Sequence, residues 1–220
     1  MPNRFLNPYI EKIKDFSGVV FFGEECKTLL NGLNHPVFLD IGCGNGENLV
    51  QQATENPQNY YIGVELQYKE VYRTALKIQR KGLNNCKVFQ MDAKKLPELF
   101  KDKRIAGVNI LFPDPWPKAK QKKNRLINND YMKALFSKSI DGAIFKFRTD
   151  NDDYFLDMLR TIYSMRDDHS IDIKELSRDI YNKVKIEHKD ITAFERIFIK
   201  QGFLINALYF IFNKSIKKYD

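Results

Sequence analysis

The sequence predicts an α/β fold with a mostly parallel, doubly wound sheet and a C-terminal antiparallel hairpin. Short apolar runs alternate with segments that have the spacing of amphipathic helices along most of the chain. The last two apolar runs are joined by Gln201-Gly202, which is typical of a hairpin turn. With 220 residues, of which 43% are hydrophobic and 13% aromatic, the chain is long enough to bury one core. We therefore expect a single domain over residues 1–220, with residues 1–34 as an N-terminal extension.

Local signals set the boundaries of the expected elements. A helix over residues 47–55 ends at Asn56-Pro57, and the helix after it ends at Gly82. Residues 166–191 are polar and irregular and give no clear prediction. Further helices are expected over residues 24–33, over residues 151–165 and in a segment that begins at Asn129 or Asp130. The seven expected strands are residues 37–41, 60–64, 86–90, 107–112, 143–147, 194–200 and 203–213.

Composition favours an anionic partner and argues against several classes of protein. The formal net charge is +8 and the pI is about 9.2, as is common in proteins that bind nucleic acid. Three cysteines and three histidines are scattered without metal-ligand spacing, so no metal site is expected. No apolar run approaches membrane-spanning length, and residues 1–14 lack a signal-peptide core. We expect a cytoplasmic protein that binds neither a membrane nor a metal.

One segment holds a carboxylate between two prolines. In the proline loop (residues 112–118, Phe-Pro-Asp-Pro-Trp-Pro-Lys), Pro115 biases Asp114 away from helical backbone, and Pro113 has a fixed φ angle. The carboxylate therefore lies on stiff backbone beside Trp116, the only tryptophan of the chain. The basic run that follows (residues 118–125) carries five positive charges and no negative one. This combination predicts chemistry on a polyanion, whereas composition alone favours a proline-rich turn beside a solvated charge run.

Acidic residues fall at or just after five predicted strand ends, where ligands bind in sheets of this kind. Each of them also has an alternative explanation as a helix cap or a turn residue. For Asp150, which precedes a helix, capping is an equal alternative. Their joint occurrence predicts a ligand-binding crevice at this edge of the sheet. The five residues are Asp40, Glu65, Asp92, Asp114 and Asp150.

The glycine loop (residues 42–46) allows a ligand to approach the backbone closely. Its glycines, Gly42, Gly44 and Gly46, differ from the dinucleotide-binding fingerprint because the third comes one residue early. Glu65 has the position of an acid that binds both ribose hydroxyls of an adenosine, which argues against a phosphate on that ribose. The loop therefore fits S-adenosylmethionine better than NAD, and both remain open on this evidence.

Six segments of the chain, taken together, carry a resemblance to a known family. They are residues 39–46, 62–65, 112–118, 149–150, 177–182 and 192–195. In this order they resemble the tRNA (guanine-N7-)-methyltransferase family of the bacterial TrmB type. The glycine loop is shared by many methyltransferases, whereas the F-P-D-P-W-x-K block, combined with T-x-F-E, is much more specific. The resemblance implies a Rossmann-like class I methyltransferase fold.

The resemblance also implies an activity. The methyl group of S-adenosyl-L-methionine would be transferred to N7 of the variable-loop guanine, tRNA nucleotide 46, to give 7-methylguanosine. Guanine N7 already has an in-plane lone pair, so no activated nucleophile or strong base is required. We hypothesise that Asp114 stays ionised, orients the guanine through its N–H edge and stabilises the developing positive charge.

Roles carry over from the family residue by residue. The sequence departs from the family pattern because Asp40 replaces a Glu, Ala193 replaces a Lys, and Gln121 and Asn124 stand where His and Arg are common. These departures affect the expected affinity more than the expected identity. Cofactor contacts are implied for Asp40, Gly42, Gly44, Gly46, Glu65, Asp92 and Asp114, and Asp114 is also the implied catalytic residue. Guanosine binding is implied for Lys118, Asp150, Thr192, Ala193, Phe194 and Glu195, and tRNA contact for Lys120, Lys122, Lys123 and Arg125.

Three other functions remain as alternatives. The first is a methyltransferase that uses the same cofactor on another RNA, a protein or a small molecule. The second is an NAD-dependent oxidoreductase, which the glycine spacing disfavours. The third is a nonenzymatic RNA-binding protein with a degenerate nucleotide fold. The sequence does not distinguish a monomer from a homodimer.

Overall fold

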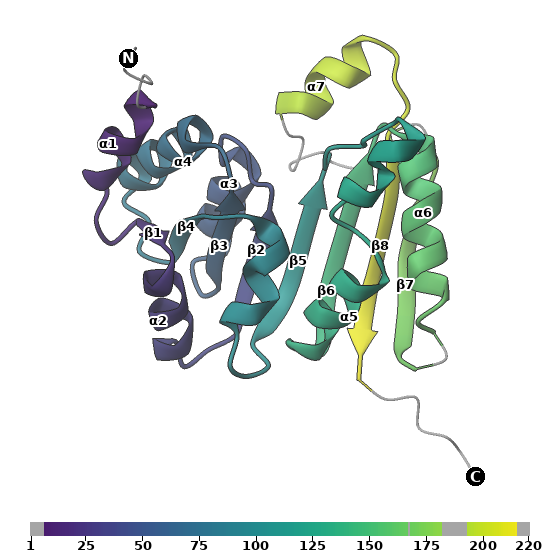
Figure 1. The fold of residues 1–220 in the computed structure, drawn as a ribbon, viewed down its shortest axis with the longest axis horizontal. Coiled ribbons are helices and arrows are strands. Elements are labelled where there is room, and N and C mark those ends of the chain that lie inside the picture. The colour runs from purple at the N-terminus through teal and green to yellow at the C-terminus, as the bar shows by residue number, and fades with distance from the viewer. Residues whose placement is uncertain (1–6, 167, 182–192, 215–220) are drawn as a thin grey trace. The chain divides into compact units, whose positions relative to one another are not determined.

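Strands are parallel in the first part of the chain and partly antiparallel in the second (Figure 1). The computed structural model describes residues 7–166, 168–181 and 193–214. By its internal contacts the chain divides into unit 1, Met1–Leu99, and unit 2, Phe100–Asp220. The single domain expected from the sequence stays a prediction, and the two units are described separately.

Unit 1 contains four strands in the order β1-β4-β3-β2 within its described part, and each of them is parallel to its neighbours in this order. Helix α1 lies against α4 (Figure 1), where the rings of Tyr9 and Tyr72 are 5.5 Å apart. The strands are β1 (Val20–Phe22), β2 (Val37–Ile41), β3 (Tyr60–Glu65) and β4 (Cys86–Gln90). The helices are α1 (Pro8–Lys14), α2 (Glu24–Gly32), α3 (Glu47–Glu55), α4 (Tyr68–Lys81) and the short 3-10 helix η1 (Ala93–Leu99).

The core of unit 1 follows the predicted periodicity. Helix α4 buries Val71, Ala75 and Ile78, which lie on one face because they are three or four residues apart. Gly82 ends this helix in the left-handed conformation, as the sequence predicted. The N-terminal segment contributes more than the sequence indicated, because Ile13, Phe16 and Val20 are buried in the same core cluster.

Unit 2 contains four strands in the order β5-β6-β8-β7 within its described part. Strands β5 and β6 are parallel, whereas β8 is antiparallel to both β6 and β7. The strands are β5 (Ile105–Leu111), β6 (Ser139–Thr149), β7 (Ser170–Ser177) and β8 (Asn206–Asn213). The helices are the 3-10 helix η2 (Ala119–Asn124), α5 (Asn129–Ser137), α6 (Asp152–Tyr163) and α7 (Ala193–Lys200).

Aromatic side chains fill the core of unit 2. Phe136 of α5 stacks on Phe212 of β8 at a centroid distance of 4.4 Å, and Phe145 stacks on Phe210 at 5.0 Å. Phe147, two residues after Phe145 and therefore on the same face of β6, contacts Tyr154 and Phe155 of α6. Helices α5 and α6 thus cover one face of this sheet.

The antiparallel strand predicted at the C-terminal end is confirmed, because β8 is antiparallel to its neighbours. The prediction of a strand over residues 194–200 was wrong. Residues 193–200 form helix α7, and the partners of β8 are β6 and β7. Gly202 has a φ of 77° and Phe203 N–H donates to Phe198 O, so Gln201-Gly202 closes a helix and is not a hairpin turn. A glycine fits both structures, and the short apolar segment before it does not decide between them.

Two strands were missed by the sequence analysis. Strand β7 lies within the region expected to be irregular, where an edge strand exposes Asp172 and Lys174 between apolar residues. Strand β1 has only three residues, which is too short for a periodic signal. The described residues therefore contain eight strands, whereas the sequence predicted seven.

Two kinds of feature are absent from the described ranges. None of their helices has the length and apolar character needed to cross a membrane. None of their histidine, cysteine and acidic side chains gather in groups that could hold a metal ion.

Candidate active site

The glycine loop leaves β2 and leads into α3 on backbone that only glycine adopts easily. Gly42, Gly44 and Gly46 have φ angles of 74°, 53° and 74°. A Cβ atom at Gly46 would lie 2.5 Å from Cγ2 of Thr74, whereas a Cβ atom at Gly42 or Gly44 would meet nothing within 4 Å. Gly46 is therefore required by conformation and by packing, while open space lies beside the first two glycines.

Helix α4 fixes the glycine loop through two side chains that the sequence analysis missed. Thr74 Oγ1 donates a hydrogen bond to Gly44 O at 3.0 Å, and Lys77 Nζ donates to Asn45 O at 2.8 Å. Thr74 is wholly buried on the otherwise apolar face of α4. A polar residue at a core position is a signal that it has a partner, although the sequence does not name that partner.

Asp40 lies near the end of β2 and is buried. Asn48 Nδ2, from α3, donates to Asp40 Oδ2 at 3.0 Å. Burial raises the pKa of Asp40 from 3.8 to about 6, with Asn48 opposing the rise and Glu65 adding to it. This carboxylate therefore changes its charge close to physiological pH.

Glu65 connects the end of β3 to the glycine loop. Its Oε2 accepts a hydrogen bond from Gly44 N at 3.0 Å, and its Oε1 accepts one from Gln67 N at 2.8 Å. Each carboxylate oxygen has two lone pairs, so both can still accept from a ribose hydroxyl. The structure thus brings Glu65 to the loop that the sequence associated with it.

Asp92 follows β4, the strand next to β3. Its Oδ1 accepts a hydrogen bond from Lys94 N at 2.9 Å, which makes Asp92 a turn residue at the start of η1. Its side chain is exposed, and Met91 N donates to Glu65 O at 3.1 Å. Within unit 1, the acids predicted at the ends of β2, β3 and β4 therefore lie along one edge of the sheet.

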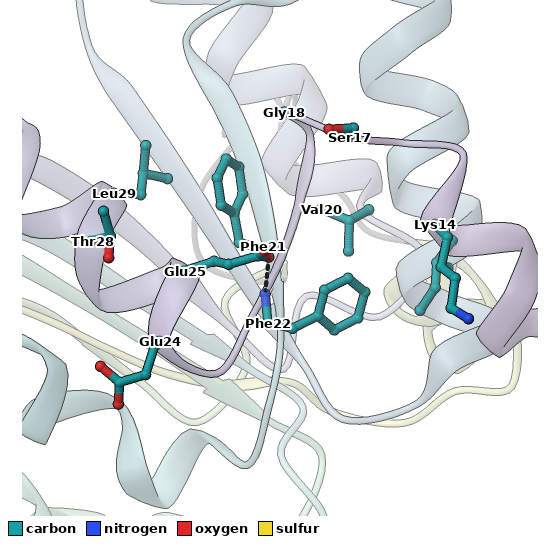
Figure 2. A pocket seen from close by; sticks show the side chains of 11 residues that line it. Lys14, Ser17, Gly18, Val20, Phe21, Phe22, Glu24, Glu25, Thr28 and Leu29 are labelled. Atoms are coloured by element: carbon teal, nitrogen blue, oxygen red, sulfur yellow. Dashed lines mark hydrogen bonds between the residues drawn. The ribbon is translucent and has the colours of Figure 1, made fainter.

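A cavity of about 690 Å³ lies elsewhere in unit 1 (Figure 2). Its lining comes from α1, β1, α2 and the segments between them, including Lys14, Val20 and Thr28. Glu25 accepts a hydrogen bond from Phe22 N at 3.2 Å there (Figure 2). The residues that line this cavity include none of the predicted site residues.

The proline loop follows β5 on strained backbone. Phe112 and Trp116 have φ angles of 53° and 43°, and for bulky L-residues this conformation costs about 1–2 kcal/mol each. Phe112 N donates to Arg148 O at 2.9 Å, and its ring stacks on Phe198 at 5.8 Å. Asp114 lies between the two strained residues with its side chain exposed. Backbone strain of this kind concentrates at functional sites, and its position here agrees with the role predicted for Asp114.

The basic run divides into exposed and internal side chains. Lys118, Lys120 and Lys123 are exposed. Lys122 is half-buried and pairs with Asp153 at 2.7 Å. Arg125 is only 3% exposed and pairs with carboxylates of α6. Three of these lysines are thus free to meet a polyanion, whereas Arg125 is part of the interior.

Asp150 directly follows β6, beside β5 in unit 2. The cap of α6 is Asn151, whose side chain accepts from Tyr154 N at 2.8 Å. Asn151 N in turn donates to Thr149 Oγ1 at 3.1 Å. Because Asn151 takes the capping role, the alternative offered for Asp150 is wrong, and its half-buried carboxylate is available for another contact.

Glu195 is the site residue most deeply buried, at 0% exposure. Its Oε1 accepts hydrogen bonds from Arg148 Nη1 at 2.7 Å and from Tyr181 Oη at 2.6 Å. Arg148 Nε also donates to the hydroxyl of Tyr209. Burial raises the pKa of Tyr181, and its hydrogen bond to Glu195 adds to the rise. The sequence analysis named the segment of Tyr181 but not this buried network.

Three other predicted guanosine contacts cannot be compared with the structure in the same way. Thr192 lies outside the described residues. Ala193 and Phe194 begin helix α7, and only their backbone is described. Their roles stay predictions.

Comparison with known proteins identifies the family of the chain. A family profile described as a putative methyltransferase matches residues 34–206. The tRNA (guanine-N(7)-)-methyltransferase of Actinobacillus succinogenes is 32% identical over 183 residues, which cover 83% of this chain and 72% of that protein. The protein of the same name from Desulfitobacterium hafniense (strain Y51) is 33% identical over 185 residues, or 84% and 83% of the two chains.

Solved structures give the fold. The 16S rRNA methyltransferase KamB has a TM-score of 0.60 at 14% identity, covering 89% of this chain and 95% of its own. The antibiotic-resistance methyltransferase Kmr has a TM-score of 0.58 at 16% identity, with 88% and 93% covered. At such low identity these structures show the fold alone, and they confirm the expected Rossmann-like methyltransferase architecture.

Proposed function

The chain belongs to the tRNA (guanine-N7-)-methyltransferase family, and from this membership we propose that it methylates N7 of a guanine in tRNA, using S-adenosyl-L-methionine. The target proposed is the variable-loop guanine at nucleotide 46, with 7-methylguanosine as the product. Beyond the sequence match, the observation that carries the proposal is the exposed carboxylate of Asp114, held between Phe112 and Trp116 in left-handed backbone. A cytoplasmic location, and the choice between monomer and homodimer, stay predictions.

The residues of unit 1 fit the proposed cofactor. Open space borders Gly42 and Gly44, and the carboxylates of Asp40 and Glu65 lie at the same loop. S-adenosylmethionine carries a cationic sulfonium and ammonium group and two ribose hydroxyls, for which carboxylates are suitable partners. We assign Asp40 and Glu65, the three loop glycines and Asp92 of unit 1 as its contacts, and the family resemblance implies a further contact from Asp114 of unit 2.

The reaction needs little from the protein beyond alignment and charge. When bound, the cofactor would supply an electrophilic methyl group to the lone pair of guanine N7. The S–C bond would break as the N–C bond forms, so that positive charge would pass to the purine ring without a proton transfer. Asp114 would accept hydrogen bonds from the guanine N–H edge and stabilise that positive charge in its ionised form. Its stiff, strained loop would hold it in place, so that alignment supplies most of the rate enhancement.

The substrate side of the site is assigned to unit 2. Lys118 and Asp150 are proposed to contact the target guanosine, together with the segment from Thr192 to Glu195. Since Glu195 is bonded to Arg148 and Tyr181, we propose that it holds this segment in place. Lys120 and Lys123, which are exposed, and Lys122, which is half-buried and paired with Asp153, are proposed to contact the tRNA backbone by neutralising phosphates. A guanine in a loop suits the reaction because its base is unstacked at low cost.

One assay tests the proposal directly. The protein is incubated with methyl-labelled S-adenosylmethionine and unmodified tRNA, and the digested tRNA is examined for 7-methylguanosine. Label in 7-methylguanosine is expected with the natural transcript and is lost when guanine 46 is replaced by adenine. Label in another nucleoside would contradict the assigned reaction, and no label in any RNA would contradict the assigned substrate.

A further inference from the structure

Arg125 is the last residue of the basic run and is the member of the run whose side chain is buried. We propose that Arg125 is a positioning residue, which fixes the proline loop to helix α6 and thereby holds Asp114, and that it does not contact tRNA. The link to catalysis rests on the proposed function. The link to loop geometry does not.

The guanidinium of Arg125 uses each of its three nitrogens inside unit 2. Nε donates to Pro115 O at 2.8 Å, Nη2 donates to Asp153 Oδ2 at 2.8 Å, and Nη1 donates to Asp157. The group also lies over the ring of Tyr154, 4.7 Å from its centroid. The planar guanidinium presents its donors on three separate nitrogens, one toward the carbonyl and one toward each carboxylate. A lysine has its three donors on one nitrogen and cannot keep this geometry.

The carbonyl that accepts from Arg125 belongs to Pro115, the residue after Asp114, and is therefore part of the Pro115–Trp116 peptide. Pro115 fixes its own φ angle, and Trp116 on the other side of that peptide has a φ of 43°. With the φ angle of Pro115 fixed, the orientation of the Pro115–Trp116 peptide depends on the ψ angle of Pro115 and the φ angle of Trp116. The hydrogen bond from Arg125 restrains that freedom and opposes relaxation of the strained tryptophan backbone.

The same geometry argues against tRNA contact by this residue. Phosphate neutralisation requires a cation that RNA can reach, and Arg125 is 3% exposed. Turning it outward would leave Asp153 and Asp157 without their shared partner and would free the Pro115 carbonyl. Lys120 and Lys123, on the same run, are exposed already.

The chain provides its own probe and its own control. Trp116 is the only tryptophan of the protein, so tryptophan fluorescence reports on the proline loop alone. Arg160 pairs with Asp157 at 2.9 Å, as part of an exposed i,i+3 pair of α6 with a side chain that is 72% exposed. Arg160→Lys therefore changes an ion pair of Asp157, the carboxylate that also pairs with Arg125. We expect no effect of this variant on the proline loop.

The first measurement is acrylamide quenching of Trp116 in the full chain without substrate. In Arg125→Lys we expect a larger quenching constant and a red-shifted emission, because the loop loses its restraint. In Arg160→Lys both should equal the wild-type values. Wild-type fluorescence in folded Arg125→Lys would overturn the proposal, whether or not the protein methylates tRNA. If Arg125→Lys does not fold, Asp157→Asn replaces it and must increase quenching in the same way.

The second measurement separates positioning from binding. We expect Arg125→Lys to lower kcat by about 10- to 100-fold, because a misplaced catalytic group costs rate more than affinity. Its KM for tRNA should stay close to wild type, whereas Lys123→Gln should raise KM and leave kcat nearly unchanged. An Arg125→Lys variant with normal kcat and raised KM would overturn the proposal in favour of a tRNA contact.

Discussion

The buried carboxylate of Asp40 lowers the stability of the free protein when it is ionised. Its carboxylate is buried beside Asn48, and burial raises its pKa from 3.8 to about 6. The folded state therefore holds the proton of Asp40 more tightly than the unfolded state. Its stabilising contribution is complete below pH 3.8 and is lost as the pH rises through 6. Above that pH, the buried negative charge is available to a cationic ligand.

We expect Asp40→Asn to stabilise the free protein in a pH-dependent way. The amide can keep the hydrogen bond from Asn48, since its oxygen is also an acceptor. At pH 8 the variant should exceed wild type in free energy of unfolding by about 3 kcal/mol, and by about half of that at pH 5. Urea unfolding at the two pH values measures the difference. An offset that is equal at both would show that Asp40 is not the titrating group.

Asp114 is predicted to matter for turnover and little for folding. Its side chain is exposed, and surface substitutions usually change stability by less than about 0.5 kcal/mol. Under the proposed function, Asp114→Ala should lower kcat at least about 100-fold, since one preorganised electrostatic group contributes this much. Single-turnover methylation of tRNA and thermal unfolding give the two readings. Near-normal methylation by the variant would refute the catalytic assignment.

Among the elements, the glycine loop depends on its neighbour α4. Gly44 O accepts from Thr74, Asn45 O accepts from Lys77, and Gly46 faces the side chain of Thr74. Helix α4 thus holds the loop by hydrogen bonds and also limits which residue can occupy position 46. The effects of backbone conformation and of packing on stability can be measured separately. Some glycines have a positive φ angle alone, Gly46 also has a neighbour that a Cβ atom would meet, and Gly32 has neither.

A series of three Gly→Ala variants tests this account. Gly46→Ala should destabilise unit 1 by about 2–4 kcal/mol, from left-handed backbone and a clash with Thr74. Gly42→Ala keeps the strain but has open space, so about 1–2 kcal/mol is expected. Gly32→Ala, at the end of α2, has neither problem and should be neutral or stabilising by up to about 1 kcal/mol. Equal losses at positions 42 and 46 would rule out the packing contribution.

Helix α7 contacts the rest of unit 2 through an ion pair, a hydrogen bond and an apolar contact. Glu195 meets Arg148 of β6 and Tyr181, and one turn further along, Phe198 stacks on Phe112. Phe112 is the first residue of the proline loop, so α7 and the loop share a contact. Within unit 2, the proline loop and α7 therefore contact each other through these two rings.

At the scale of the whole molecule, the sequence predicted most of the helices and strands but few of the side-chain contacts between them. Strands at residues 37–41 and 86–90 and the helix closed by Gly82 were found because apolar spacing and a glycine stop are local signals. Strand β7 and helix α7 were missed, since an edge strand exposes charges and a short apolar segment fits two structures. The candidate site residues were named from strand ends and from family motifs, and their roles stay predictions.

Side-chain partners could not be predicted in the same way. Arg125 and Asp157 are 32 residues apart, and Thr74 and Gly44 are 30 apart. No local pattern encodes such a pairing, because it arises only when two elements pack. The basic run shows the consequence. Its charges look equivalent in sequence, yet the structure buries Arg125 and exposes Lys120 and Lys123.

The net charge of +8 bears on tRNA binding through its distribution. If Lys120 and Lys123 neutralise phosphates, the double variant with glutamine at both should have a salt slope, d log K/d log [salt], shallower by about 1–2 units. The matched control replaces Lys101 and Lys133, two exposed lysines of unit 2 outside the run, and lowers the net charge equally. Filter binding of tRNA over a range of KCl concentrations measures each slope.

Because long-range attraction is screened within about 10 Å at 0.1 M salt, only the loss of local contacts should change the slope strongly. Equal slopes in the two double variants would mean that tRNA responds to total charge and that the basic run has no special contact.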